Sequence, residues 1–554
     1  MSDTFNGDFA RLVPRNQIAH RLFSATCIYV EENKTFHLRF LKRNNVSSGM
    51  LAASDEPVES STDYDSQLES EIEGFQMEDS GYFVLSFDQE REPEFPHLGW
   101  RVGRGAGKSP ANRGVDLLLS KPGDNLSRSL ASIHMIFHFN QRSGLLMLKG
   151  GSHKAPVEYR FGDKWVKLEY DEEHLIYEPS IRIRAGMCEY ELEHTIEEKY
   201  RTLYFEKRDR FLKAQLPGNL EFKIKPLQRM PVDSYVLRGH YLELETRGSG
   251  AFGWITQGLD TKTGDLVAIK ELRIEARNKS EVMAEVNMGT RMYKLSLIYD
   301  ISNTLQNKPG LLLTLSAMCE HGRPEICCDL ERFFLFMPSA ISDFTGGFWG
   351  NTSIPRPAKL HLLREPLEGL KTLHAMGIMH RDIRPKNMLI MSNDPPRASL
   401  CDYGKAIEAK TSKFTKIGPI YTLAPEVWTV ARDGPYTAKI DTWAYGYAIA
   451  EVLGYRPPDS SRITQERLAS ILRALRASYV RGTDGEPLVD LVSKLLVWKP
   501  RDRWSAEQAL EHECWLPIAR EQDGRYDDPA EAARGKRILL EDPRSDPHGQ
   551  YLDL

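Results

Sequence analysis

The sequence predicts a multidomain protein in which an all-β sandwich precedes a two-lobed α+β domain. The chain has 554 residues, well beyond the roughly 250 to 300 at which a single hydrophobic core stops growing, so more than one domain is expected. Short β-rich runs separated by Gly, Pro, Asn and Asp clusters recur between residues 82 and 194, which is typical of a sandwich. From about residue 235, strand patterns come first and longer helical patterns follow, the order expected of an α+β domain.

These patterns divide the chain into five parts. We expect an N-terminal segment at 1–80, acidic and largely disordered from about residue 45, because this stretch has few large apolar groups. The other four parts are a β-sandwich at 81–195, a connector with helical spacing at 196–234, the α+β domain at 235–517 and a polar tail at 518–554.

Composition limits the classes of function. The chain is 41% hydrophobic and 27% charged, as in soluble globular proteins, and its formal charge of -5 argues against a mainly nucleic-acid-binding role. Seven scattered cysteines suit free thiols in a reducing compartment. The N-terminus has no apolar core of signal-peptide length, and the longest apolar run, at 310–315, is too short to span a bilayer. We therefore expect a nuclear or cytoplasmic protein without a membrane segment.

The most informative motif is the run His380–Asn387, which reads HRDIRPKN. It places a carboxylate at Asp382 and an amide at Asn387 beside several cations. The run 402–404 (DYG) follows, and a glycine-rich run lies far upstream at 248–253. These are the parts that phosphoryl transfer needs: a group that holds the attacking hydroxyl, oxygen ligands for magnesium, and backbone donors over the phosphates.

The chain resembles eukaryotic protein kinases from about residue 235 to residue 515. The motifs that carry the resemblance include a strand lysine in VAIK (267–270), the APE run at 424–426, the DTW run at 441–443 and Arg503. They occur in kinase order with kinase-like separations. The resemblance implies a two-lobed protein kinase fold, ATP and Mg²⁺ as cofactors and protein substrates. It also implies that the glutamate of APE pairs with Arg503.

The same resemblance assigns roles to the site residues. Asp382 would orient the substrate hydroxyl and accept its proton, while Asn387 and Asp402 would bind Mg²⁺. Lys270 would neutralise the α- and β-phosphates. Arg384 stands where serine/threonine kinases usually carry a lysine that meets the γ-phosphate, so the charge is kept and the geometry changes.

The nucleotide pocket is assigned in the same way. Glu285 is the expected partner of Lys270, with Glu281 as the competing candidate. The remaining pocket residues implied by the resemblance are the phosphate-loop glycines Gly248, Gly250 and Gly253, the roof residues Ile255 and Ala268, the floor residue Leu389, the back-wall residue Met337 and the hinge backbone near Ser339 and Ala340. Arg247 stands where a branched apolar residue is usual, so an arginine stem would form part of the roof.

Substrate specificity and regulation depend on residues near the catalytic loop. Pro419 and Arg384 are the residue types found at these positions in tyrosine kinases, which the chain resembles there. The rest of the tyrosine-kinase catalytic-loop signature is missing, so serine/threonine specificity is favoured. Because Arg381 precedes Asp382, the resemblance implies a basic pocket that a phosphorylated activation segment could fill. The candidate hydroxyls are Thr411, Ser412 and Thr415.

The β-rich region resembles a forkhead-associated (FHA) domain, a sandwich whose loops bind phosphothreonine. Arg104 follows the strand GWRV, and Ser132 and His134 open the strand IHMIFHF. We expect Arg104 and Ser132 to hold the phosphate and His134 to brace a loop. Ala131 replaces the serine usual in the family, with Ser129 and Ser132 as nearby substitutes. The alternative is a sandwich that keeps the fold and has lost phosphopeptide binding.

FHA domains joined to kinases occur in DNA-damage checkpoint kinases, which this architecture resembles. The leading hypothesis is a protein kinase, more plausibly serine/threonine-specific, that is targeted by a phosphothreonine reader and acts in DNA-damage or cell-cycle signalling. The alternative is a catalytically weak kinase-fold scaffold or adaptor. The expected partners are protein substrates and phosphothreonine-containing proteins.

Overall fold

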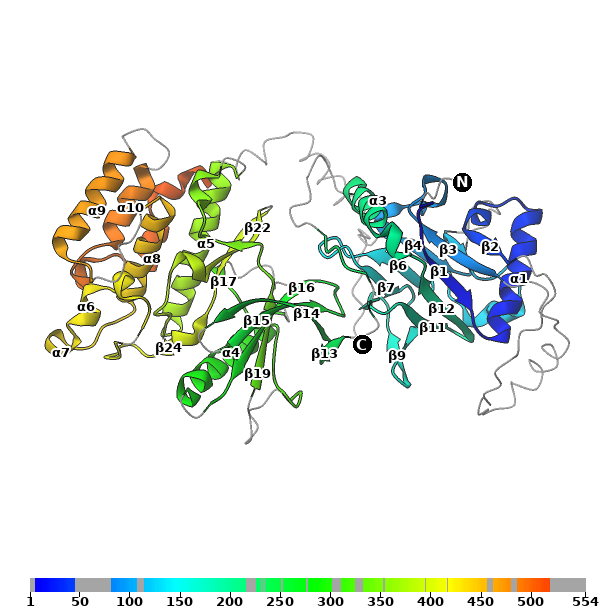
Figure 1. Cartoon of the computed structure of the whole chain (residues 1–554), viewed down its shortest axis with the longest axis horizontal. Helices are drawn as coiled ribbons and strands as arrows, with labels where there is room; N and C mark the ends of the chain where they lie inside the picture. The colour runs from blue at the N-terminus through cyan, green and yellow to red at the C-terminus, as the bar shows by residue number, and fades with distance from the viewer. Residues whose placement is uncertain are drawn as a thin grey trace, which may run out of the picture. The chain divides into compact units, whose positions relative to one another are not determined.

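The computed structural model forms two compact units, which are described separately (Figure 1). The first comprises residues 1–246 and 256–267, and the second comprises residues 247–255 and 268–554. The described residues are 5–44, 81–106, 114–215, 226–230, 232, 235–250, 253–275, 278–300, 310–323, 332–351, 354–393, 395–415, 417–455, 462–479 and 486–518. The segment predicted to be disordered, from about 45 to 80, and the tail beyond 518 lie outside these residues.

The first unit is a sandwich of two sheets. One sheet has the order β2-β3-β1-β12-β11-β8-β9, and the other has the order β10-β7-β6-β4-β5. The strands of the first sheet are β1 (Asp8–Pro14), β2 (Leu41–Arg43), β3 (Gly81–Ser86), β8 (Val157–Phe161), β9 (Lys164–Leu168), β11 (Ser180–Ala185) and β12 (Cys188–His194). Those of the second are β4 (Trp100–Gly103), β5 (Leu117–Leu118), β6 (Met135–Phe139), β7 (Leu146–Gly150) and β10 (Glu173–Leu175).

The sandwich begins earlier than the predicted boundary at residue 81. Strand β1 lies between β3 and β12 in the first sheet, and the helix α1 (Gln17–Glu32) contributes Leu22 and Phe23 to the same core. The prediction that 1–80 is a separate segment is therefore wrong for residues 8–43. The reason is physical: β1 pairs with a strand that lies far away in the sequence, and local patterning does not report such a pairing.

The connector also belongs to the sandwich. Helix α3 (Arg201–Ala214) places Phe211 against Trp100 of β4, with ring centroids 5.4 Å apart. Trp100 also meets Phe9 of β1 at 5.3 Å. The guanidinium of Arg208, fully buried, donates hydrogen bonds to the carbonyl oxygens of residues 144 and 227. Helical spacing in the connector was predicted, but its packing into the sandwich core was not.

The second unit contains part of a six-stranded sheet and one long helix. The strands follow the order β13 (Val236–Arg238), β14 (Tyr241–Gly250), β15 (Gly253–Asp260), β16 (Leu266–Arg273), β19 (Arg332–Pro338) and β18 (Ser316–Cys319). Of these, β18 and β19 lie wholly in the second unit. Helix α4 (Lys279–Asp300) packs Val282 and Val286 into a core with Leu272 and Leu335. The strands-first order predicted from the sequence is present.

Helices dominate the rest of the second unit. The central helix α8 (Lys439–Val452) is buried on nearly all faces, as its continuous run of apolar residues requires. The other helices are α5 (Arg356–Ala375), α6 (Pro425–Trp428), α7 (Val430–Asp433), α9 (Gln465–Ser478), α10 (Glu486–Leu495) and α11 (Ala506–Leu510), of which α5 and α10 pack against α8. Short strands complete it: β17 (Gly310–Leu311), β20 (Ser342–Asp343), β21 (Ile378–Met379), β22 (Met388–Asn393), β23 (Pro396–Leu400) and β24 (Ile407–Glu408).

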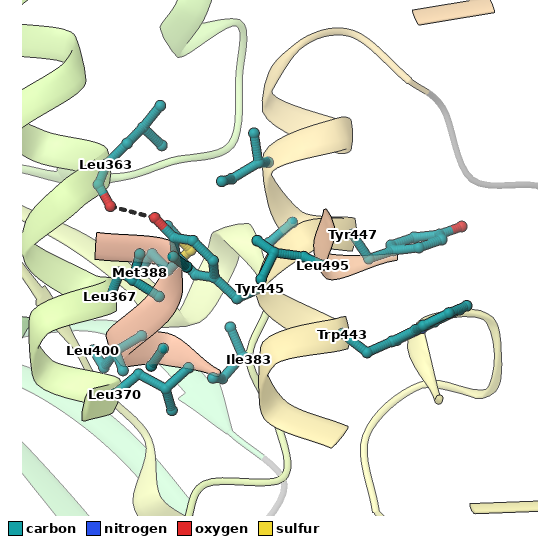
Figure 2. Close-up of a cluster of buried hydrophobic side chains, with 14 of the residues drawn as sticks. Leu363, Leu367, Leu370, Ile383, Met388, Leu400, Trp443, Tyr445, Tyr447 and Leu495 are labelled. Carbon is teal, nitrogen blue, oxygen red and sulfur yellow. Dashed lines mark hydrogen bonds between the residues drawn. The ribbon is translucent and has the colours of Figure 1, made fainter. Parts of the chain in front are cut away.

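The core between α5 and α8 anchors the functional loops. Figure 2 shows Tyr445 reaching from α8 toward α5, where its hydroxyl donates a hydrogen bond to the carbonyl oxygen of Leu363. Leu370 of α5 and Ile383, from the loop after β21, are buried in the same cluster. The loop that carries Asp382 is thus tied to the hydrophobic core of the unit.

Replacing Leu370 by alanine should lower the free energy of unfolding of this unit by about 2 to 5 kcal/mol, because a fully buried leucine leaves a cavity. Tyr445→Phe, which removes only a hydroxyl, should cost about 1 kcal/mol. Hydrogen exchange of the amides of α5 and α8 measures both changes. A larger loss for Tyr445→Phe than for Leu370→Ala would contradict this account of the core.

Candidate functional sites

A partly buried lysine links the sheet to α4 and to Asp402. The Nζ of Lys270, on β16, forms an ion pair with Glu285 of α4. It forms a second ion pair with Asp402, whose Oδ1 lies 2.8 Å from it. Burial alone would lower the pKa of Lys270, but Glu285 and Asp402 outweigh it and raise that pKa above its usual range. The predicted pairing with Glu285 is confirmed, and the side chain of the rival Glu281 lies outside the described residues.

The catalytic-loop candidates lie close together. The Nδ2 of Asn387, which belongs to the short helix η7 (Pro385–Asn387), donates to the carbonyl oxygen of Asp382 at 2.8 Å and to its Oδ2 at 3.1 Å. The other carboxylate oxygen, Oδ1, is buried without a hydrogen-bond partner in the described part of the chain. Burial raises the pKa of Asp382 above its usual value, although His380 opposes it. A buried acceptor with one unpaired oxygen can take a proton from an incoming hydroxyl.

Asp441 holds the catalytic loop in place. This carboxylate on α8 is fully buried and accepts three hydrogen bonds: from the backbone nitrogens of His380 at 2.9 Å and Arg381 at 2.7 Å, and from the Nε2 of His374 at 2.9 Å. Burial would raise the pKa of Asp441, but its partners, His374 first, hold it below its usual range. In the sequence this residue stood out only as part of the DTW motif, because its three partners lie 60 to 67 positions upstream.

Asp402 has an unusual backbone conformation. Its φ of 62° is left-handed, and it precedes the short helix η8 (Tyr403–Lys405). Burial would raise the pKa of Asp402, but Lys270 outweighs it and lowers that pKa below its usual value. The next residue, Tyr403, places its ring 5.5 Å from that of His380 and donates its hydroxyl hydrogen to the carbonyl oxygen of Leu400 at 3.0 Å.

The donor set fits magnesium. Because the amide nitrogen of Asn387 is engaged by Asp382, its amide oxygen is left as the ligand-forming atom, and Asp402 supplies an ionised carboxylate. Hard oxygen donors of this kind are what Mg²⁺ prefers. Lys270 would supply the protein cation for the nucleotide phosphates. Among the described residues there is no cluster of three or more His, Cys, Asp or Glu side chains that could hold another metal ion.

The predicted nucleotide residues lie on strands of the second unit or beside them. Strand β14 ends at Gly250 and β15 begins at Gly253, so the glycine-rich run includes the end of one strand and the start of the next. The environment of the side chains at 245–253 lies outside the description. Ile255 is 37% exposed on β15, Met337 of β19 packs on the small core, and Leu389 of β22 pairs with Asp343. Ala268 lies on β16, Ala340 follows β19, and Gly248 lies on β14.

A second predicted ion pair is present in the helical part. The guanidinium of Arg503 is fully buried and binds both carboxylate oxygens of Glu426, at 2.6 and 3.0 Å. It also donates to the carbonyl oxygen of Lys439 and lies 4.9 Å from the ring centroid of Trp443. This bidentate pair fixes the end of the segment that runs from Asp402 to Glu426.

In the sandwich, the predicted phosphate residues lie on two adjacent loops. The backbone nitrogen of Arg104 donates to the carbonyl oxygen of Ala131 at 3.1 Å, and that of Gly105 donates to the carbonyl oxygen of Ser132 at 3.0 Å. The side chain of Arg104 is exposed. The two loops therefore bring Arg104 and Ser132 together, as the resemblance implied.

His134 braces the second of these loops. Its Nδ1 accepts a hydrogen bond from the backbone nitrogen of Ala131 at 3.1 Å, and its Nε2 lies 3.2 Å from the carbonyl oxygen of Pro156. Burial lowers the pKa of His134 to about 4, so the ring is neutral at physiological pH. Ser129, the other substitute serine, instead accepts a hydrogen bond from the backbone nitrogen of Met187.

The carboxyl group of Glu451, whose Oε1 is buried, lies near the catalytic-loop residue Arg384 and was not among the residues predicted from the sequence. Burial raises the pKa of Glu451, on α8, to about 7, and Arg384 only partly opposes this. Its Oε1 is buried without a hydrogen-bond partner in the described part of the chain. A glutamate near the end of an apolar helix gives no sequence signal that distinguishes it from a solvated one.

Glu451→Gln should therefore raise the melting temperature more at pH 8 than at pH 5. The folded-state pKa lies above the ordinary value of 4.5, so the cost of ionising Glu451 grows between pH 4.5 and 7 and stays constant above that range. Thermal unfolding at the two pH values measures the difference. Glu426→Gln is the control, since it breaks a formed ion pair and should destabilise the protein at both. Equal effects of Glu451→Gln at both pH values would refute the assignment.

No helix among the described residues has the length and apolar character needed to cross a membrane.

Comparison with known proteins gives a family for about half of the chain. A model described as the protein kinase domain matches residues 241–515. Rat mitogen-activated protein kinase 12 is 26% identical over 54% of this chain and 86% of its own length. Serine/threonine-protein kinase STE20 of Candida glabrata is 27% identical over 51% of this chain, and human serine/threonine-protein kinase D3 is 28% identical over 49%.

The chain spans only 28% of the length of each of these last two relatives. A crystal structure of Rad53 1-466 in complex with AMP-PNP covers 75% of this chain and 91% of its own, at 22% identity and a TM-score of 0.39. This score is too low for any conclusion to be drawn from that likeness. The motif order, the ion pairs and the family match agree with one another: residues 241–515 form a protein kinase domain.

Proposed function

We propose that the protein is an active protein kinase that transfers phosphate from ATP, with Mg²⁺, to serine or threonine hydroxyls of protein substrates. The observation that carries the proposal is the arrangement of Lys270, Asp402 and Asp382. The lysine is already paired with Glu285, and the Oδ1 of Asp382 is unpaired among the described residues. A kinase-fold scaffold that only binds other proteins does not require a lysine paired for phosphate binding or a catalytic carboxylate with an unpaired oxygen.

A cavity in front of Asp382 offers room for the substrate. It has a volume of about 570 Å³ and lies entirely within the second unit. One part of its wall is charged, with Asp382 and the cations Arg384 and Lys405. The other part is largely apolar, and includes Ile417, Pro419, Ile420, Leu423 and Trp428. This cavity fits a polypeptide that presents a hydroxyl to Asp382 and an apolar neighbour to the opposite wall.

In this proposal the protein's own residues act mainly by position and charge. Asp382 orients the attacking hydroxyl and accepts its proton, aided by the amide of Asn387, which fixes the carboxylate. Lys270 holds the nucleotide phosphates, and Asn387 and Asp402 hold the metal, which would neutralise charge on the phosphates. Arg384 adds positive charge on the substrate side of the cavity.

Serine/threonine specificity is favoured over tyrosine specificity. Two of the relatives are named as serine/threonine kinases, although they are distant. Arg384 and Pro419, the two residues that depart from the serine/threonine pattern, both line the cavity. They are therefore the positions at which the residue preference would be altered.

Asp382→Asn should reduce phosphate incorporation from radiolabelled ATP by about 10²- to 10⁴-fold, because the variant keeps the shape and loses the proton acceptor. The matched control is Asp433→Asn, an aspartate paired with Arg432 on the surface of α7, which should leave the rate unchanged. Equal incorporation by wild type and Asp382→Asn would show that the domain is a scaffold rather than an enzyme.

We further propose that the sandwich is an FHA-like reader of phosphothreonine, so that the kinase is guided to phosphorylated proteins. Arg104 is exposed beside Ser132, and the neutral His134 holds the second loop in place. An arginine fork and a hydroxyl on adjacent loops can bind phosphate through charge-assisted hydrogen bonds. A nuclear or cytoplasmic role in DNA-damage or cell-cycle signalling rests on this architecture alone.

Fluorescence polarisation of labelled threonine peptides on the full chain tests the reader. A phosphorylated peptide should bind at least about tenfold more tightly than its unphosphorylated form, and Arg104→Ala should remove the difference because it deletes the fork. Arg128→Ala, at an exposed arginine whose side chain contacts Asn125, is the control. Binding of the two peptides with equal affinity would mean that the sandwich has kept the fold without the function.

A further inference from the structure

The segment between Asp402 and Glu426, here named the activation segment, is hydrogen-bonded to Tyr436, which precedes α8. Ser412 and Tyr436 exchange two backbone hydrogen bonds, with N–O distances of 3.0 and 2.9 Å. The hydroxyl of Tyr436 donates to the carbonyl oxygen of Phe414 at 2.6 Å, and the backbone nitrogen of Phe414 donates to the Oγ of Ser412 at 3.2 Å. Tyr436 is only 2% exposed, so this set of bonds is anchored in the core.

Phe414 of the activation segment contacts Arg381, which precedes the catalytic aspartate Asp382. The ring centroid of Phe414 lies 5.7 Å from the guanidinium carbon of Arg381, within cation–π range. The Nε of Arg381 donates to the carbonyl oxygen of Lys405 at 2.6 Å, while Nη1 is buried without a hydrogen-bond partner among the described residues. In this arrangement an aromatic ring lies over the guanidinium.

Beyond Phe414 the segment runs directly against the catalytic carboxylate. Gly418 has a positive φ of 38°, and a Cβ atom there would lie 3.4 Å from the Oδ1 of Asp382 and 3.4 Å from the carbonyl oxygen of Arg381. Thr415 and Ile417 form the adjoining wall of the cavity in front of Asp382. Any loosening of the segment at Phe414 would therefore change the cavity wall.

We propose that Tyr436 and Phe414 are positioning residues that keep the activation segment ordered without a phosphate on it. The sequence resemblance implied that a phosphorylated hydroxyl would fill the pocket at Arg381 through charge-assisted bonds. Here neutral hydrogen bonds from the buried Tyr436, together with the ring of Phe414, hold the same stretch of chain. The kinetic consequence, activity that does not depend on phosphorylation of Thr411, Ser412 or Thr415, rests on the proposed kinase function.

The first experiment measures order directly and does not need enzymatic activity. The full chain is treated with phosphatase, its unphosphorylated state is verified by mass spectrometry, and trypsin cleavage after Lys410 and Lys413 is followed over time. Tyr436→Phe keeps the ring and loses the hydroxyl, so cleavage should become about three- to tenfold faster, the size expected for one lost hydrogen bond. Tyr479→Phe is the matched control, because it removes a hydroxyl that donates to a carbonyl oxygen, that of Leu453, elsewhere in the domain.

The second experiment measures phosphate transfer to a generic protein substrate by the same unphosphorylated samples. Wild type should keep its kcat after phosphatase treatment, within about twofold. Tyr436→Phe should lower kcat about three- to tenfold with little change in KM for ATP. Phe414→Leu should lower kcat, whereas Phe414→Tyr, which retains an aromatic ring over Arg381, should restore it.

Two results would overturn the proposal: equal cleavage of Tyr436→Phe and wild type, or loss of wild-type activity on dephosphorylation with recovery on rephosphorylation. Complete inactivity of wild type in both phosphorylation states would instead refute the proposed kinase function. The proteolysis result would still decide whether Tyr436 holds the segment.

Discussion

The buried carboxylate of Asp441 is the constraint on which the active site depends. A fully buried charge is stable only when hydrogen-bond donors surround it, and here the donors are two backbone nitrogens of the catalytic loop and the imidazole of His374. Satisfying Asp441 therefore fixes the path of the loop. The loop in turn fixes Asp382 and Asn387, so the geometry of the proposed chemistry depends on a buried carboxylate of α8.

A second electrostatic constraint links the sheet to the helices. Lys270 lies between two carboxylates, and the removal of the lysine would leave both of them without their shared cation. The pairing therefore couples the positions of β16, α4 and Asp402. In the activation segment the contacts are neutral. Tyr436 donates a hydrogen bond to Phe414, and the ring of Phe414 lies near the guanidinium of Arg381.

Sequence patterns predicted those features that depend on local order and on motif spacing. The strand-then-helix order followed from local patterning, and the Lys270–Glu285 and Arg503–Glu426 pairs followed from the resemblance to protein kinases. The place of β1 in the sandwich sheet and the packing of α3 could not be seen, because both depend on contacts distant in sequence. The buried state of Glu451 and the hydrogen bond from Tyr436 to Phe414 are likewise properties of packing, which residue identity alone does not report.

The measurement that tests the central claim most directly is phosphoamino-acid analysis of proteins phosphorylated by the purified full chain in the presence of ATP and Mg²⁺. The account predicts phosphoserine and phosphothreonine, because the cavity in front of Asp382 belongs to a kinase domain whose catalytic loop lacks most of the tyrosine-kinase signature. Phosphotyrosine alone would contradict the serine/threonine specificity that we propose, and it would make Arg384 and Pro419, the two residues that depart from the serine/threonine pattern, the first positions to vary. The absence of any phosphorylated product would contradict the enzymatic claim itself.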